Sequence, residues 1–86
     1  MELKLDPDKY EELQEIFIKA VIETTMIKLV ESGLKDRQLE AVTASIAFSI
    51  ASLIDDTTGI ESGGIDVKPY LTFRTGDDEL THCGEN

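Results

Sequence analysis

The sequence contains one histidine and one cysteine, and the two are neighbours at His82 and Cys83. A histidine and a cysteine can serve as zinc ligands, or as a base and the nucleophile that it activates. Adjacent side chains on a strand point to opposite faces, so these two do not readily meet one ion or each other. A zinc site also needs more ligands of this kind. The sequence therefore predicts no catalytic residues and no cofactor.

Three carboxylates, Asp55, Asp56 and Glu61, lie close together just after a predicted helix. The negative end of the helix dipole adds to their mutual repulsion, and a hard divalent cation would relieve both effects. The order of the residues departs from the EF-hand loop, which needs alternating acidic or amide positions and a distant Glu. These three residues are the candidate metal ligands, and the alternative interpretation is a solvated acidic loop.

The composition excludes several classes of protein. The 86 residues carry 18 acidic and 8 basic side chains, which gives a net charge of −10. Binding to nucleic acid by phosphate neutralisation needs clustered Lys and Arg, and anionic membranes repel such a chain, so neither is expected as a direct partner. Hydrophobic residues make up 41% of the sequence, enough for one folded domain over residues 1–86.

The position of the apolar residues predicts the compartment. The longest uncharged run, residues 41–54, is shorter than the roughly 20 residues of a membrane-spanning helix. Residues 1–6 lack the basic and apolar regions of a signal peptide. One cysteine cannot form an internal disulfide, so nothing marks an oxidising compartment. A cytoplasmic protein is expected.

Two amphipathic helices are predicted in the first two thirds of the chain. Asp6 before Pro7 is a typical helix start, and Gly33 is a typical stop, which places the first helix at about residues 7–32. Asp36 is the predicted N-cap of a second helix over about residues 37–54. The short link between them predicts an antiparallel helical hairpin.

Each predicted helix carries a second apolar stripe, opposite the one that faces its neighbour. Leaving such a stripe in water forgoes about 1.5–3 kcal/mol for each aliphatic side chain. The covering layer must be the C-terminal segment or another chain, and a homodimer that forms a four-helix bundle would cover both stripes. The predicted interface residues are Ile22, Met26, Leu29, Val30, Ala44, Phe48 and Ala51.

The remaining residues predict a small β-structure. Residues 55–64 are rich in Asp, Thr and Gly, which indicates an acidic, glycine-containing loop. Apolar and polar residues then alternate from Ile65 to Arg74, with Pro69 restricting this strand to a sheet edge. A turn and a short return strand complete a β-hairpin over about residues 65–83. The expected fold class is mainly α, with α+β character.

The unpaired apolar stripes and the absence of a catalytic arrangement favour a small non-enzymatic protein-binding or assembly module. The alternative is an acidic inhibitor that occupies the basic nucleic-acid-binding surface of a partner protein. Residues 55–86 carry eight acids and two bases, a net charge of −6, and such a surface favours a basic partner. A divalent-metal-dependent enzyme that uses the loop carboxylates at 55–61 ranks third.

Overall fold

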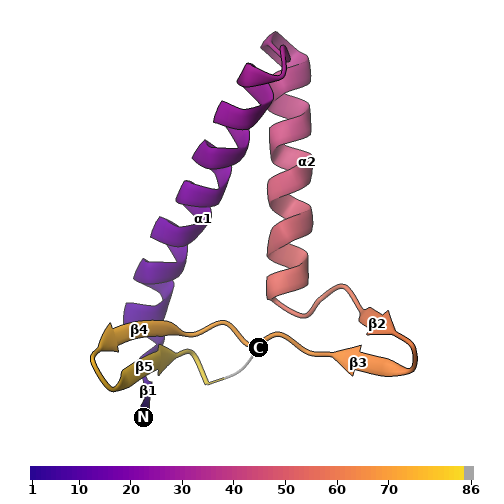
Figure 1. Ribbon diagram of the computed structural model, residues 1–86. Coiled ribbons are helices and arrows are strands. Elements are labelled where there is room, and N and C mark those ends of the chain that lie inside the picture. Colours follow the sequence, from indigo (N-terminus) through magenta and orange to yellow (C-terminus); the bar gives the residue numbers. More distant parts are fainter. Residues whose placement is uncertain (85–86) are drawn as a thin grey trace.

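The structure is a computed structural model that describes residues 1–84 of the chain. It combines two helices with short strands, which confirms the mixed α+β class (Figure 1). The elements in chain order are β1 (Glu2–Leu5), α1 (Pro7–Glu31), α2 (Asp36–Ile54), β2 (Ile60–Ser62), β3 (Ile65–Val67), β4 (Phe73–Gly76) and β5 (Glu79–His82).

The start of α1 follows from its first residues. The side chain of Asp6 accepts a hydrogen bond from the backbone N–H of Lys9 at 3.1 Å. Pro7 occupies the first helical position, where its fixed φ suits the helix and its missing N–H costs nothing. The predicted start of the helix is therefore confirmed.

The end of α1 is a Schellman motif. The N–H of Leu34 donates to the carbonyl of Leu29 at 3.1 Å, and the N–H of Gly33 donates to the carbonyl of Val30 at 3.0 Å. Gly33 has a φ of 100°, which a residue with a Cβ adopts only at a cost. The helix thus ends at Glu31, one residue before the predicted boundary.

The start of α2 differs from the prediction. Lys35 is the N-cap, with an extended backbone and no side-chain capping bond, and Asp36 is the first helical residue. The predicted capping role of Asp36 is therefore wrong. Its φ of 58° is a conformation that Asp tolerates better than most residues. From the first turn, its carboxylate still favours the positive end of the helix dipole.

The two helices run in opposite directions and form a V (Figure 1). They lie close together beside the link at residues 32–35 and diverge towards the strands. Among the described residues, neither helix combines the length and the apolar composition that crossing a membrane requires.

A three-stranded sheet in the order β1-β5-β4 packs at the start of α1. β1 pairs with β5 in parallel, with Leu3 opposite Leu80, and β4 pairs with β5 antiparallel. The rings of Tyr10 and Phe17 on α1 contact Phe73 of β4, at centroid distances of 5.4 and 6.1 Å. This aromatic cluster joins the helix to the sheet.

The predicted β-hairpin over residues 65–83 is confirmed in its second half, where β4 pairs antiparallel with β5, and is wrong in its first half. β3 pairs with β2, which lies inside the predicted loop, and a second hairpin joins β4 to β5. The predicted strand is interrupted between Val67 and Phe73. Pro69 lies in this interruption, and its lack of an N–H donor weakens any continuous ladder there. β1 is an additional strand that the sequence did not indicate.

The chain is extended for its size. Its radius of gyration is 15.6 Å, whereas a compact domain of this length has about 12 Å. Its accessible surface is 6353 Å², against about 5,050 Å² for a compact monomer of this mass. The excess is about 1,300 Å² of surface that the chain does not bury against itself.

Candidate protein-interaction surface

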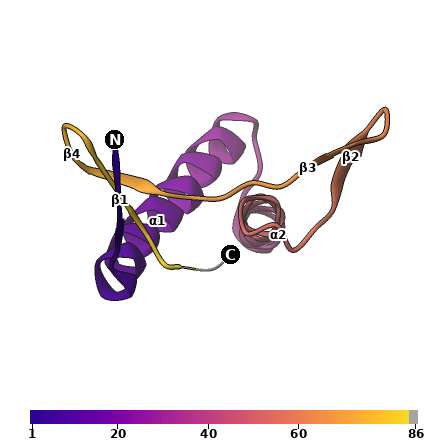
Figure 2. The same ribbon diagram turned by 90° about the horizontal axis from the view of Figure 1, so that it is seen from below.

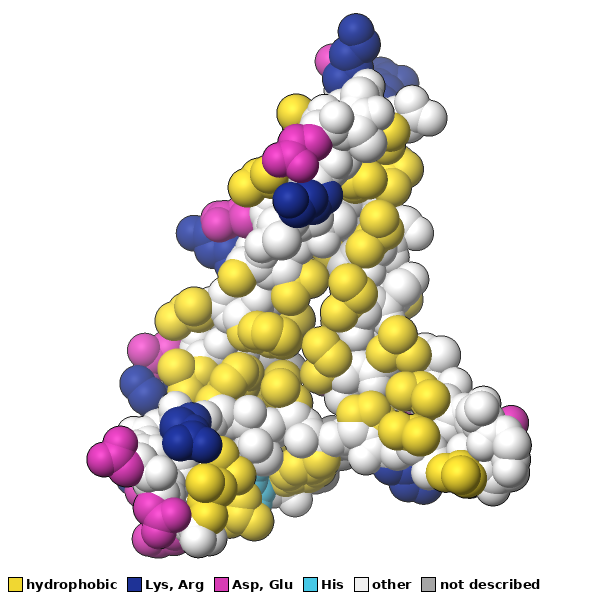
Figure 3. Space-filling view, in the orientation of Figure 1, with side chains coloured by type: hydrophobic (Ala, Val, Ile, Leu, Met, Phe, Trp, Pro, Cys, Tyr) yellow, Lys and Arg dark blue, Asp and Glu magenta, His cyan; other side chains and the backbone are white. Residues whose placement is uncertain are grey.

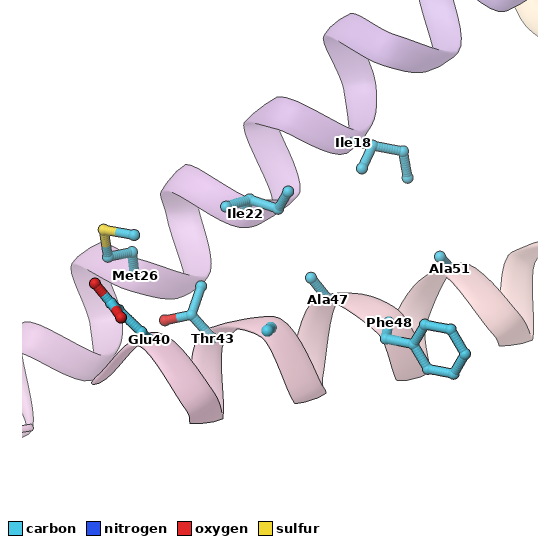
Figure 4. Close-up of a pocket in the computed structure, with 9 residues that line it drawn as sticks. Ile18, Ile22, Met26, Glu40, Thr43, Ala47, Phe48 and Ala51 are labelled. Atoms are coloured by element: carbon cyan, nitrogen blue, oxygen red, sulfur yellow. The ribbon is translucent and has the colours of Figure 1, made fainter. Parts of the chain in front are cut away.

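An apolar groove lies between the diverging helices and has a volume of about 470 Å³. Its lining residues are Ile18, Ile22 and Met26 from α1, and Glu40, Thr43, Ala44, Ala47, Phe48 and Ala51 from α2. These nine residues define the interhelical groove (Figure 4).

Helical spacing places these residues on one side of each helix. Ile18, Ile22 and Met26 are separated by four residues each, so they form a single row along α1. Thr43, Ala47 and Ala51 form the matching row on α2. Figure 4 shows Ala47 and Ala51 directed towards α1 and Ile18 directed towards α2. The small alanine side chains leave the space between the two rows unfilled.

The rim of the groove is exposed and apolar. The ring of Phe48 lies beside α2, is not directed at α1, and remains 75% exposed (Figure 4). Met26 and Ile22 are 39% and 37% exposed. In the space-filling view, hydrophobic side chains follow the crease between the helices (Figure 3). An uncovered apolar surface of this kind is typical of a protein-interaction site.

Thr43 is the buried polar residue of the groove. It is only 4% exposed, and its hydroxyl Oγ1 has no hydrogen-bond partner among the described residues. A buried hydroxyl without a partner costs about 1–3 kcal/mol. The groove therefore holds a buried polar atom whose hydrogen bond is not satisfied by the described residues.

The structure brings together five of the seven predicted interface residues in this groove: Ile22, Met26, Ala44, Phe48 and Ala51. Their predicted orientation is wrong, because the stripes were expected opposite the neighbouring helix, whereas these residues line the crease between the two helices of one chain. Leu29 and Val30 do not line it. Val30 lies instead in a shallow depression on α1 that it shares with Met26 and Ile27. Met26 thus lines both the groove and this depression.

Sequence reasoning missed Ile18, Glu40, Thr43 and Ala47 as lining residues. The signal for Ile18 was present, because it lies one turn before Ile22 on the same row. The same signal was present for Ala47, which lies one turn before Ala51, and Thr43 lies one turn before Ala47. A small side chain and a hydroxyl become part of the groove only through the angle at which the two helices diverge.

The predicted metal ligands of the acidic loop take part in the end of α2 and in the turn of the β2–β3 hairpin. Asp55 is the C-cap of α2, and Asp56 follows with a φ of 58°. The carboxylate of Glu61 accepts a hydrogen bond from the N–H of Gly64 at 2.7 Å, which supports the turn between β2 and β3. Residues 1–84 contain no group of three His, Cys, Asp or Glu side chains that could hold a metal ion. The three predicted ligands are thus not brought together.

His82 is engaged by its neighbours. Its Nδ1 accepts a hydrogen bond from the N–H of Gly84 at 3.2 Å and lies 2.9 Å from the hydroxyl of Tyr70. Because Nδ1 accepts from a backbone N–H, it carries no proton in this arrangement. The ring of Tyr70 also lies 6.0 Å from the imidazole, centroid to centroid. These contacts tie residues 70 and 84 to β5.

No family model, curated protein or solved structure matches this chain.

Proposed function

We propose that this protein is a non-enzymatic assembly module that forms a homodimer through the interhelical groove. The observation that carries the proposal is the excess of about 1,300 Å² of accessible surface over a compact monomer. A standard protein interface covers about 800 Å² on each subunit. One such interface would therefore remove more than half of this excess from each chain.

A second copy supplies the complementary shape. Two V-shaped helix pairs that close on each other form a four-helix bundle, in which the helices of one copy cover the groove of the other. Ala44, Ala47 and Ala51 permit a close helix approach because their side chains are small. Phe48 on the rim would become a buried anchor, the role in which aromatic residues contribute most to interfaces.

The test is the molar mass in solution, measured by light scattering over a range of protein concentrations. The wild-type chain is expected at twice its 9.5 kDa. Ile22→Asp places a charge in the groove and should give a monomer. Ile16→Asp is the matched control, because Ile16 is 61% exposed on α1 and does not line the groove, so the dimer should persist.

Circular dichroism verifies that both variants remain helical. A wild-type mass of 9.5 kDa at every concentration would overturn the proposal. An equal loss of dimer in both variants would show that the groove has no special part in assembly.

A second candidate function, inhibition of a basic nucleic-acid-binding protein, is favoured by the position of the acidic residues. Glu61, Asp66, Asp77 and Asp78 are all exposed on the two β-hairpins. A basic partner held by these carboxylates should be released by salt and displaced by duplex DNA. Binding that survives high ionic strength and an excess of DNA would remove the basis of this candidate.

A further inference from the structure

The β2–β3 hairpin, residues 60–67, extends away from the rest of the chain and forms an arm. Figures 1 and 2 show this arm to one side of α2, on the opposite side from the three-stranded sheet. Its two strands pack mainly against each other, and no other described element packs extensively on either strand. The arm therefore receives little support from its own chain.

The strand register makes the arm amphipathic. Ile60 lies opposite Val67, and Ser62 lies opposite Ile65, so these four side chains share one face. Glu61 lies opposite Asp66 on the other face, where their like charges repel. Ile65 is 67% exposed and Val67 is 47% exposed.

An isolated two-stranded hairpin is marginal in water, and opposed carboxylates weaken it further. Glu61 compensates in part, since it also accepts the hydrogen bond from Gly64 in the turn. The exposed apolar face destabilises the arm more, because no other described element covers it. A stable arm thus requires another surface.

The interhelical groove alone is too small for a standard interface. The exposed fractions of Phe48, Met26 and Ile22 together correspond to about one and a half large side chains. An aromatic side chain buries about 150–250 Å², so these three supply roughly 200–400 Å² of the ~800 Å² that each subunit needs. A dimer needs further contacts outside the groove.

We propose that the apolar face of the arm packs against the second copy of this chain and extends the groove interface. This inference rests on the proposed homodimer. In a two-fold symmetric dimer each copy gives one arm and receives one, so the contact occurs twice. The arm supplies Ile60, Ile65 and Val67 to the interface, while Glu61 and Asp66 stay in water.

Three serine substitutions at consecutive positions test the arm. Ile65→Ser and Val67→Ser each remove an apolar side chain from the apolar face of the arm without changing the charge. Each should raise the dimer dissociation constant about tenfold or more, measured by sedimentation. Asp66→Ser is the matched control on the opposite face and should leave the constant within about twofold or lower it, since a repulsive charge is removed.

Hydrogen exchange adds a readout that does not depend on these variants. The amides of the arm should exchange slowly in the wild-type dimer and rapidly in the Ile22→Asp monomer. A wild-type chain that stays monomeric overturns the dimer and the arm contact together. A wild-type dimer whose dissociation constant responds equally, or not at all, to the three serine substitutions overturns the arm contact alone.

Discussion

The ring of Tyr10 on α1 lies against the ring of Phe73 on β4, with centroids 5.4 Å apart and planes tilted by 51°. Tilted aromatic pairs of this kind are worth about 0.5–1.5 kcal/mol beyond the area that they bury. The pair joins the first turn of the helix to a strand that follows more than sixty residues later. Together with the contact of Phe17 on Phe73, it links α1 to the sheet.

Phe73→Ala is expected to lower the free energy of unfolding by about 2–3 kcal/mol, because Phe73 contacts both Tyr10 and Phe17 and is only half-buried. Denaturant unfolding at one fixed protein concentration measures this loss, since assembly also contributes to stability. Ile16→Ala is the control and should change stability by less than about 1 kcal/mol, because Ile16 is exposed. Equal effects would contradict the role of the aromatic cluster.

The stability of the protein should fall at alkaline pH because of Tyr10. Burial raises the pKa of Tyr10 above its ordinary value of 10.0, and the negative charges of Cys83, Asp55 and Tyr70 add to the effect. The folded chain therefore holds this proton more tightly than the unfolded chain does. The stabilisation is complete below the unfolded pKa and decreases as the pH rises through the raised pKa.

The Tyr10→Phe variant tests this pH dependence, because phenylalanine keeps the ring and removes the titration. Its free energy of unfolding should fall less steeply than that of the wild type when the pH passes above 10.0. The absorbance of the tyrosine phenolates can be titrated with pH in both folded proteins. The wild type should show an additional phenolate signal, that of Tyr10, which appears above pH 10.0 and is missing from the variant. If the signal that the variant lacks appears below pH 10.0 in the wild type, burial does not raise the pKa of Tyr10.

Two buried threonines should respond to valine in opposite directions. Thr43 has no hydrogen-bond partner among the described residues, so Thr43→Val should raise the free energy of unfolding by about 1 kcal/mol or more. Thr81 is almost fully buried, and its Oγ1 lies 2.9 Å from Oγ1 of Thr75, so Thr81→Val should lower it by about 1 kcal/mol. A loss of stability in Thr43→Val would mean that this hydroxyl is hydrogen bonded in the assembled protein.

Gly33 at the end of α1 should be sensitive to alanine for conformational reasons alone. An added Cβ would meet no atom within 4 Å, but the φ of 100° is unfavourable for alanine. Gly33→Ala is thus expected to cost about 1–2 kcal/mol of stability. Gly59→Ala also meets open space, at a φ that other residues accept, and should change stability by less than about 1 kcal/mol. Similar costs at both positions would contradict the strain argument.

The helix ends were predictable because their signals are local. Asp6 and Gly33 determine the bounds of α1 through hydrogen bonds within a few residues, and Pro7 acts through its fixed φ. Asp36 shows the limit of this reasoning. It carries the usual side chain of an N-cap, but the helix starts one residue earlier and leaves its carboxylate in the first turn.

The sheet was less predictable because its pairing is set by distant contacts. The alternation from Ile65 to Arg74 correctly indicates extended chain, yet it does not say which neighbour each part pairs with. Ile65 pairs with β2 and Phe73 with β5, so one predicted strand belongs to two sheets. Likewise, the row through Ile22 and Met26 was visible in the sequence, whereas the divergence that opens the groove is a tertiary feature that helical spacing does not indicate.

The parallel pairing of β1 with β5 also affects the order in which the elements can fold during protein synthesis. A ribosome adds about 5–20 residues per second, so roughly 4–15 s pass between completion of Leu5 and of His82. Throughout that interval Leu3 and Leu5 belong to a strand without its partner, the kind of segment that chaperones protect. Helices α1 and α2 need only local contacts and can form meanwhile. β1, although made before its partner, is therefore among the last of the described elements to fold.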